Sequence, residues 1–486
     1  MAIIPQNQLF GRRLHIHVCV DTCASLHFGW KEIENIGDLD RLRLVIKYLP
    51  DEKLMQILEK ERGKGRDDFP VRPVWNTILA GVVFQHISIE SLRRELKRNG
   101  QLRDICGLDL LKGLEAVPNP WAYSRFLKRL MEHQDEVDEM FDTLVEQLKL
   151  VLPDFGQLLA LDGKGIETHA RGRKVEEGEQ QEPDGRRDTD ADWGVKSYSG
   201  QREDSTLWEK VKSWFGFKLH LIVDANYELP IAFKVTKASE AEMVKAHYLL
   251  DGIEERHLDI LKMCDCLDAD RGYDDGKLIT RLWDSYGIKP VIDIRNMWKD
   301  GEDTKVIEGK WNIIYNYKGQ IFCVCPKTGK TREMAYGGFE KDRETLKYRC
   351  PAQHYGYECS GCSKCPVKKA VRIPLAEDRR VFTPMARSSF QWKSIYKKRT
   401  SVERVNSRLD VSFGFEDHFI RGLTKMKLRC SLALCVMLAM ALGRIKENQE
   451  ELMLKPGKKR LKSIRQKDKI IRVEKQRGEV CPNFLK

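Results

Sequence analysis

The stretch QLLALDGKG, residues 157–165, is a short apolar run that stops at an acidic residue between apolar and glycine-rich sequence. An apolar run without alternation is typical of a strand that is buried on both faces. A second apolar segment, residues 258–267, leads in the same way into DADRGYD, residues 268–274. Because neighbouring buried strands end at the same edge of a sheet, we expect Asp162 and Asp270 to converge in space.

The segments around these two runs predict a mixed sheet with crossover helices. Residues 215–223 and 229–235 are strand-like on either side of a polar turn, which predicts a hairpin. Residues 276–286 are helix-like and precede a further strand at 288–294. Between residues 171 and 209 the chain is polar and charge-rich without periodicity, so we expect a long loop there.

The chain on either side of this core predicts further units. Residues 1–150 are expected to form a helical domain, whose short basic helices fit either DNA binding or a plain helical bundle. The catalytic core is expected at 151–295 and again at 386–450, with a Cys-rich insertion at 296–385 between the two parts. A basic tail follows at 451–486.

The 486 residues carry a formal net charge of +12, which favours polyanionic partners and nucleic acid first. No secretory signal opens the sequence. The longest apolar run, residues 430–443, is shorter than the roughly 20 residues that span a bilayer, so we expect a buried core helix there. These features predict a cytoplasmic protein without a membrane partner.

A third carboxylate comes from YKKRTSVERVNSRLD, residues 396–410. A helix there would place Tyr396, Arg399 and Glu403 on one face. Two carboxylates cannot both stay ionised at close range without a cation between them, and magnesium prefers hard oxygen ligands. One interpretation is therefore a magnesium site that cleaves phosphodiesters, with the arginine gripping phosphate. The alternative is an ordinary surface helix with a Glu–Arg ion pair.

In this order, the segments resemble the three signature blocks of insertion-sequence DDE transposases, in the group with the Tyr-x2-Arg-x3-Glu-x6-Lys signature. The similarity covers roughly residues 60–445. The segments that carry it are ALDGK at 160–164, ADRGYD at 269–274 and the Tyr396-x2-Arg399-x3-Glu403 spacing, together with GFKLH at 216–220 followed by Asp224, and the helical region from FPVRP at 69–73 to SRF at 124–126.

The resemblance implies a ribonuclease-H-like α/β core with an N-terminal helical domain. It implies that Asp162, Asp270 and Glu403 bind Mg²⁺ or Mn²⁺ and catalyse strand cleavage and strand transfer at insertion-sequence ends. Asp270 is favoured over Asp268 because it directly precedes Arg-Gly-Tyr. The implied partner is double-stranded DNA, both inverted-repeat ends and target, bound by a dimer in the prokaryotic nucleoid.

The resemblance also implies contacts to DNA-end phosphates. The residues expected to make them are Tyr396, Lys397, Lys398 and Arg399. The final lysine of the signature is Asp410 here, so an anion replaces a cation that should meet phosphate, and either Arg408 or the two lysines could substitute. Alternative functions are a ribonuclease-H-like nuclease that does not join DNA and a catalytically silent, transposase-derived DNA-binding protein.

Fourteen cysteines are too sparse for a disulfide scaffold and are more typical of thiols or metal ligands. The insertion holds CSGCSKC, residues 359–365, and a further cysteine upstream. Four thiolates can form a tetrahedral zinc site, here Cys350, Cys359, Cys362 and Cys365. Free thiols and an iron–sulfur cluster stay open, and in the latter case the cluster would be the working site. Cys264 and Cys266 are expected to be core residues of a buried strand.

Overall fold

The computed structural model describes residues 39–63, 68–172, 188–201, 207–361 and 365–453. Four expectations fall wholly or partly elsewhere. The loop expected at 171–209 is described only in part, because 173–187 and 202–206 lie outside these ranges. Residues 1–38 of the expected helical domain, the basic tail from residue 454 onward and the zinc-ligand candidate Cys362 lie outside the described residues.

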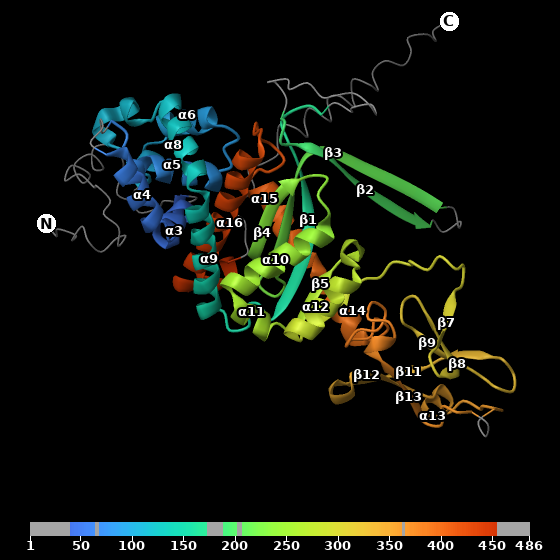
Figure 1. Ribbon diagram of the computed structural model, residues 1–486. Helices are drawn as coiled ribbons and strands as arrows, with labels where there is room; N and C mark the ends of the chain where they lie inside the picture. Colours follow the sequence, from blue (N-terminus) through green and yellow to red (C-terminus); the bar gives the residue numbers. More distant parts are fainter. Residues whose placement is uncertain (1–38, 64–67, 173–187, 202–206, 362–364, 454–486) are drawn as a thin grey trace, which may run out of the picture.

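A mixed sheet forms the centre of the protein (Figure 1). Its strands are β1 (Leu158–Glu167), β2 (Asp192–Gln201), β3 (Leu207–Asp224), β4 (Leu229–Lys237), β5 (Cys266–Ala269) and β6 (Lys289–Ile292). They lie in the order β2-β3-β1-β5-β6, and β4 also pairs with β3. β1 is antiparallel to β3 but parallel to β5, and β5 is parallel to β6. The predicted mixed α/β sheet and its β3–β4 hairpin are confirmed.

The parallel register between β1 and β5 sets the position of the two aspartates. Leu161 pairs with Ala269, the last pair before both strands reach an aspartate. Asp162 and Asp270 are therefore the next residues along neighbouring strands. β5 ends there, whereas β1 continues to Glu167, so this edge of β1 is not covered by β5.

Helices cover both faces of the sheet. These are α10 (Glu242–Arg256), α11 (Leu258–Met263), α12 (Gly276–Tyr286), α14 (Phe390–Tyr396) and α15 (Thr400–Ser412). Alternate residues of a strand point to opposite faces. Lys164 of β1 bonds Asp410 on α15, while the adjacent Gly163 lies against Glu242 on α10. α10 and α15 thus pack on opposite faces of β1.

The N-terminal part is helical and packs beside the sheet (Figure 1). It comprises α3 (Asp40–Tyr48), α4 (Glu52–Arg62), α5 (Val71–Val83), α6 (Ile89–Arg98), α7 (Gly100–Ile105), η2 (Leu110–Ala116), α8 (Pro120–Glu132) and α9 (Gln134–Val151). Ser88 caps α6 by accepting a hydrogen bond from the Ser91 amide. α9, α3 and α5 pack on α16 (Leu423–Lys446), which also contacts β4. α16 is long and apolar enough to cross a membrane, but 78% of its most apolar stretch is buried, so the expected core helix is confirmed.

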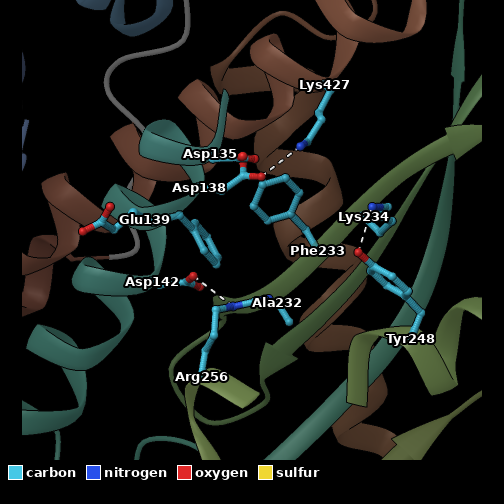
Figure 2. A pocket seen from close by; sticks show the side chains of 11 residues that line it. Asp135, Asp138, Glu139, Asp142, Ala232, Phe233, Lys234, Tyr248, Arg256 and Lys427 are labelled. Atoms are coloured by element: carbon cyan, nitrogen blue, oxygen red, sulfur yellow. Dashed lines mark hydrogen bonds and ion pairs between the residues drawn. The ribbon is translucent and has the colours of Figure 1, made fainter. Parts of the chain in front are cut away.

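A cavity of about 500 Å³ lies at the seam between this helical part and the sheet. Figure 2 shows that charges from different elements pair across it. Asp142 of α9 bonds Arg256 of α10 at 2.9 Å, and Asp138 bonds Lys427 of α16 at 2.9 Å. These pairs tie α9 of the N-terminal part to α10 and α16.

Residues 296–385 form two small sheets outside the central one (Figure 1). Their strands are β7 (Thr304–Ile307), β8 (Lys310–Asn316), β9 (Ile321–Val324) and β10 (Thr331–Glu333) in one sheet, and β11 (Ala335–Glu340), β12 (Thr345–Arg349) and β13 (Ala370–Pro374) in the other, with helix α13 (Pro351–Tyr355). They share a hydrophobic core that is separate from the main one. Short 3₁₀ turns are η3 (Arg271–Tyr273), η4 (Lys341–Arg343), η6 (Leu375–Glu377), η7 (Lys397–Arg399) and η8 (Glu450–Leu452).

Three expectations about local structure were wrong. Asp162 does not end its strand, because β1 continues past it to Glu167 and stays paired with β3. Much of the loop expected at 171–209 is β2 and the first part of β3, which form a two-stranded arm that projects from the sheet (Figure 1). The arm carries exposed polar residues, so no buried-face pattern marks it in the sequence. Residues 258–263 form helix α11 and only Cys266–Ala269 is strand, because a short apolar run does not distinguish the two. Cys264 and Cys266 are buried, as expected.

Candidate active site

Asp162 lies inside β1 and Asp270 directly follows β5, and both are oriented by the backbone that follows them. Asp162 accepts a hydrogen bond from the Gly163 amide at 2.8 Å. Asp270 caps the turn η3, where it accepts from the Gly272 amide at 2.6 Å. Each carboxylate is therefore held close to the backbone that follows it.

Negative charge is concentrated around Asp162. Burial raises the pKa of Asp162 to about 6; the Lys196 ammonium lowers this pKa, whereas the nearby carboxylates of Asp270 and Glu242 raise it. A cluster of hard oxygen ligands that disfavours its own ionisation is stabilised by a divalent cation. The donor chemistry of this edge therefore fits Mg²⁺ or Mn²⁺.

Glu403 lies in the first turn of α15, which packs against β1 and β3. Its carboxylate is half exposed and forms an ion pair with Arg399 at 2.9 Å. Burial opposes the charge of Arg399, but Glu403, Asp162 and Asp270 are among the groups that raise the pKa of Arg399. The guanidinium thus lies near all three carboxylates. Among the described residues, no three His, Cys, Asp or Glu side chains lie close enough together to hold a metal ion.

The expected stripe of three residues is present, although the helix is not uniform. Tyr396 ends α14, the turn η7 follows, and α15 begins at Thr400. The Tyr396 ring stacks on Trp392 at 4.7 Å, and the Arg399 guanidinium lies 5.8 Å from the Tyr396 ring centre. The structure therefore brings together the tyrosine, the arginine and the glutamate of the signature.

The basic residues beside this stripe point in different directions. Lys397 is exposed, whereas Lys398 donates to Asn226 Oδ1 at 2.7 Å, in the turn between β3 and β4. Arg408 donates to the Glu228 carbonyl in the same turn. Lys398 and Arg408, two of the residues considered as substitutes for the missing signature lysine, are thus engaged away from the strand-end aspartates.

Asp410, which stands at the final signature position, is paired with a lysine. Lys164 Nζ of β1 donates to Asp410 Oδ2 at 2.6 Å, and both side chains are largely buried. The anion at this position is therefore neutralised by the strand that carries Asp162.

Glu242 is a carboxylate at this edge that the sequence analysis missed. It is the first residue of α10, and its Oε1 lies 3.2 Å from Lys196 Nζ and 3.6 Å from Lys218 Nζ. Acidic residues are common in the first turn of a helix, where they favour the helix dipole. Nothing in the local sequence therefore distinguishes Glu242 from an ordinary helix-start residue.

Three other polar residues, Asp268, His220 and Asp224, are buried in the interior of the sheet. Asp268 lies on β5 two residues before Asp270, is fully buried, and has no hydrogen-bond partner in the described part of the chain; burial raises its pKa well above the usual value. His220 lies 3.0 Å from the Thr236 hydroxyl, and burial lowers the pKa of His220 to about 3. Asp224 accepts from the Gly156, Asn226 and Tyr227 amides and so fixes the β3–β4 turn.

Most of the thiols expected to bind zinc share one neighbourhood. Burial raises the pKa of Cys323 to about 11, and Cys350, Cys365 and Cys359 raise it further because their thiolates lie nearby. Asn312 Nδ2 contacts Cys365 Sγ at 3.6 Å. Cys323, on β9, is the member of this group that the sequence analysis did not assign.

Comparison with known proteins gives a family for the core. The family model described as "Transposase DDE domain" matches residues 153–439, more than half of the chain. No curated protein matches the sequence. Among solved structures, the chain resembles the cryo-EM structure of the piggyBac transposase synaptic complex with hairpin DNA, at 11% identity and a TM-score of 0.34, covering 94% of this chain and 88% of the other. A likeness at that score carries no argument about this protein.

Proposed function

The chain belongs to the family of transposases with a DDE domain, and from that membership we propose that it cuts and joins DNA at the ends of an insertion sequence. The family consists of phosphoryl-transfer enzymes that act in DNA transposition and use divalent metal ions. Beyond this family membership, the proposal names an insertion sequence as the DNA element, Asp162, Asp270 and Glu403 as the metal-binding residues, and strand joining as the second step.

One observation carries the assignment of residues. The parallel register of β1 and β5 sets Asp162 beside Asp270 at an open strand edge, and Arg399 connects both to Glu403 electrostatically. Two carboxylates at the β1–β5 edge and a helical one, from segments far apart in sequence, therefore lie near one guanidinium, which supports assigning them to one site.

We assign the binding of Mg²⁺ or Mn²⁺ to Asp162, Asp270 and Glu403. Such ions, when bound, supply an activated water or 3′-hydroxyl and stabilise the leaving oxygen of the phosphodiester. Glu403 must leave Arg399 to join the aspartates, because the ion pair now engages its carboxylate. The released Arg399 guanidinium can then bind a DNA phosphate in bidentate fashion.

Double-stranded DNA is the proposed partner, both as element ends and as target. The net charge of +12 supports a polyanionic partner. On the arm, Lys212 lies directly opposite Lys196, and Lys196 reaches the Gly163 carbonyl at 2.9 Å. Residues opposite one another share a face, so the lysine-bearing face of the arm is directed toward the carboxylates. Pairing of two ends would place a dimer on the DNA, in the nucleoid.

The test uses a duplex that carries the inverted repeats flanking the gene. Glu403→Gln should abolish strand cleavage in Mg²⁺ and leave binding of the ends within about twofold, because a neutral amide is a poor magnesium ligand. Glu416→Gln, which removes an exposed carboxylate from the loop after α15, is the matched control. Full cleavage by Glu403→Gln would refute the assignment.

Pre-cut ends separate the alternatives. A transposase joins them to target DNA, whereas a nuclease cuts without joining and a silent DNA-binding descendant does neither.

We also propose a structural zinc ion at the thiol group formed by Cys323, Cys350, Cys359 and Cys365, because four thiolates can form such a site. These thiols would have to move closer together to hold the ion. Purified protein should contain about one zinc per chain. Cys323→Ser should lose it, whereas Cys435→Ala on α16 should retain it. Zinc-free wild-type protein, or iron in place of zinc, would contradict this proposal.

A further inference from the structure

Glu242 lies near Asp162 and Asp270 on the face of β1 that α10 covers, opposite the face that α15 covers. Its two carboxylate oxygens lie beside the two glycines that follow the aspartates. A Cβ atom added to Gly163 would lie 2.9 Å from Glu242 Oε1, and one added to Gly272 would lie 2.9 Å from Glu242 Oε2. The carboxylate therefore occupies space that exists only because both positions lack a side chain.

The same space adjoins Asp270. The Cβ atom added to Gly272 would lie 2.7 Å from Asp270 Oδ1. Asp270 Oδ1 and Glu242 Oε2 therefore flank one point and are separated by less than the sum of those two distances. Two ionised oxygens this close repel each other unless a cation lies with them.

A buried tyrosine hydroxyl lies near these carboxylates. Tyr273 is fully buried, and its hydroxyl has no hydrogen-bond partner in the described part of the chain. Burial raises the pKa of Tyr273, and the nearby carboxylates of Glu242, Asp162 and Asp270 raise it further. A buried donor among three acceptors that bonds none of them is rare in native proteins. The tyrosine hydroxyl therefore does not occupy the lone pairs of the three carboxylates.

Two lysines balance the charge of Glu242 in this state. Lys196 from the arm and Lys218 from β3 lie within 3.2 Å and 3.6 Å of Oε1. Burial lowers the pKa of Lys218, although the Glu242 carboxylate opposes that effect. The two lysines neutralise the charge of the Glu242 carboxylate. A bound divalent cation would take over that role from an ammonium group.

We infer that Glu242 is a fourth acidic ligand of the divalent-cation site, seated between Gly163 and Gly272 opposite Asp162 and Asp270. This inference rests on the proposed function, because it extends the cation site proposed there. Glu242 would contact the cation on the side away from Glu403, since α10 and α15 cover opposite faces of β1.

The test counts the waters on a bound ion and needs no DNA or activity. Terbium(III), an oxygen-seeking probe, is bound to the full-length protein, and its luminescence lifetimes in H₂O and D₂O give the number of coordinated waters. Glu242→Gln should add about one or two waters, because each lost carboxylate oxygen is replaced by solvent. Removing a structural ion pair alone would change the affinity through charge but not the water count.

A second variant removes no carboxylate from the sequence. Gly163→Ala should displace the Glu242 carboxylate and raise the water count in the same direction, whereas Gly276→Ala is its matched control, since an added Cβ there meets nothing within 4 Å. Glu255→Gln, an exposed residue on the same helix, is the control for the charge change.

Asp162→Asn separates the two proposals. An added water in Asp162→Asn but not in Glu242→Gln or Gly163→Ala would overturn the inference and leave the proposed cation site standing. Unchanged water counts in all three variants would overturn the cation site and the inference together.

Discussion

Lys164 Nζ donates to Asp410 Oδ2 at 2.6 Å, across the interface between β1 and α15. This contact joins the strand of Asp162 to the helix of Glu403, and its side chains are only 15% and 22% exposed. An ion pair in such a position costs more to break than a surface pair, because the remaining charge stays poorly hydrated.

The pair should therefore show coupling in a double-mutant cycle. Asp410→Ala or Lys164→Ala alone should each lower the free energy of unfolding by about 1–3 kcal/mol, and the double variant should lose less than the sum. Urea denaturation measures all four proteins. Additive losses would mean that the two side chains do not interact in solution.

The arm should contribute to DNA affinity. Lys212→Glu reverses an exposed charge on the face that carries Lys196. We expect weaker end binding and a salt dependence whose slope falls by about one, the value of a single phosphate contact. Lys262→Glu on α11 makes the same charge change away from the arm. Equal effects of the two charge reversals would mean that Lys212 acts only through the net charge of the protein and not through a contact with DNA.

The seam between the helical part and the core should depend on pH through His257. Its ring nitrogens lie 2.5 Å from Glu146 and 3.2 Å from Asp142, both on α9. Burial opposes the charged form, but the hydrogen bonds to Asp142 and Glu146 outweigh it and raise the pKa of His257 above 6.5.

A raised histidine pKa stabilises the folded state fully below pH 6.5, and this contribution is lost as the pH rises through the folded-state value. His257→Gln should lower the free energy of unfolding by about 1–2 kcal/mol near pH 6 and by clearly less near pH 9. Thermal or urea unfolding at both pH values measures the difference. A deficit that grows with pH would contradict the assigned sign.

The sequence predicted those features that a short segment contains. Asp162 and Asp270 follow apolar runs, and the parallel pairing of these runs sets the two aspartates side by side, although β1 continues past Asp162 to Glu167. The spacing of Tyr396, Arg399 and Glu403 likewise predicts contact between neighbours on one helical face, although a 3₁₀ turn interrupts the helix.

Features that depend on contacts between distant segments could not be predicted. Glu242 belongs to the site only because Gly163 and Gly272, from two other elements, leave room for it. In the described part of the arm, Val195 and residues 210–213 are exposed, so the alternation of buried and exposed positions that identifies strands is missing there. Cys323 lies near the other thiols because Cys323, Cys350 and Cys365 pack against one small core, which spacing within CSGCSKC does not reveal.

The most direct test of the account asks whether one cation lies beside all three carboxylates. Iron(II) replaces magnesium at such sites, and with ascorbate and peroxide it generates hydroxyl radicals that cut the nearby polypeptide. With a DNA end bound, we predict cuts near Asp162, Asp270 and Glu403 that excess Mg²⁺ suppresses and that Asp162→Asn abolishes together. Cuts near the aspartates with none near Glu403, in the presence of the DNA end, would contradict the shared cation site.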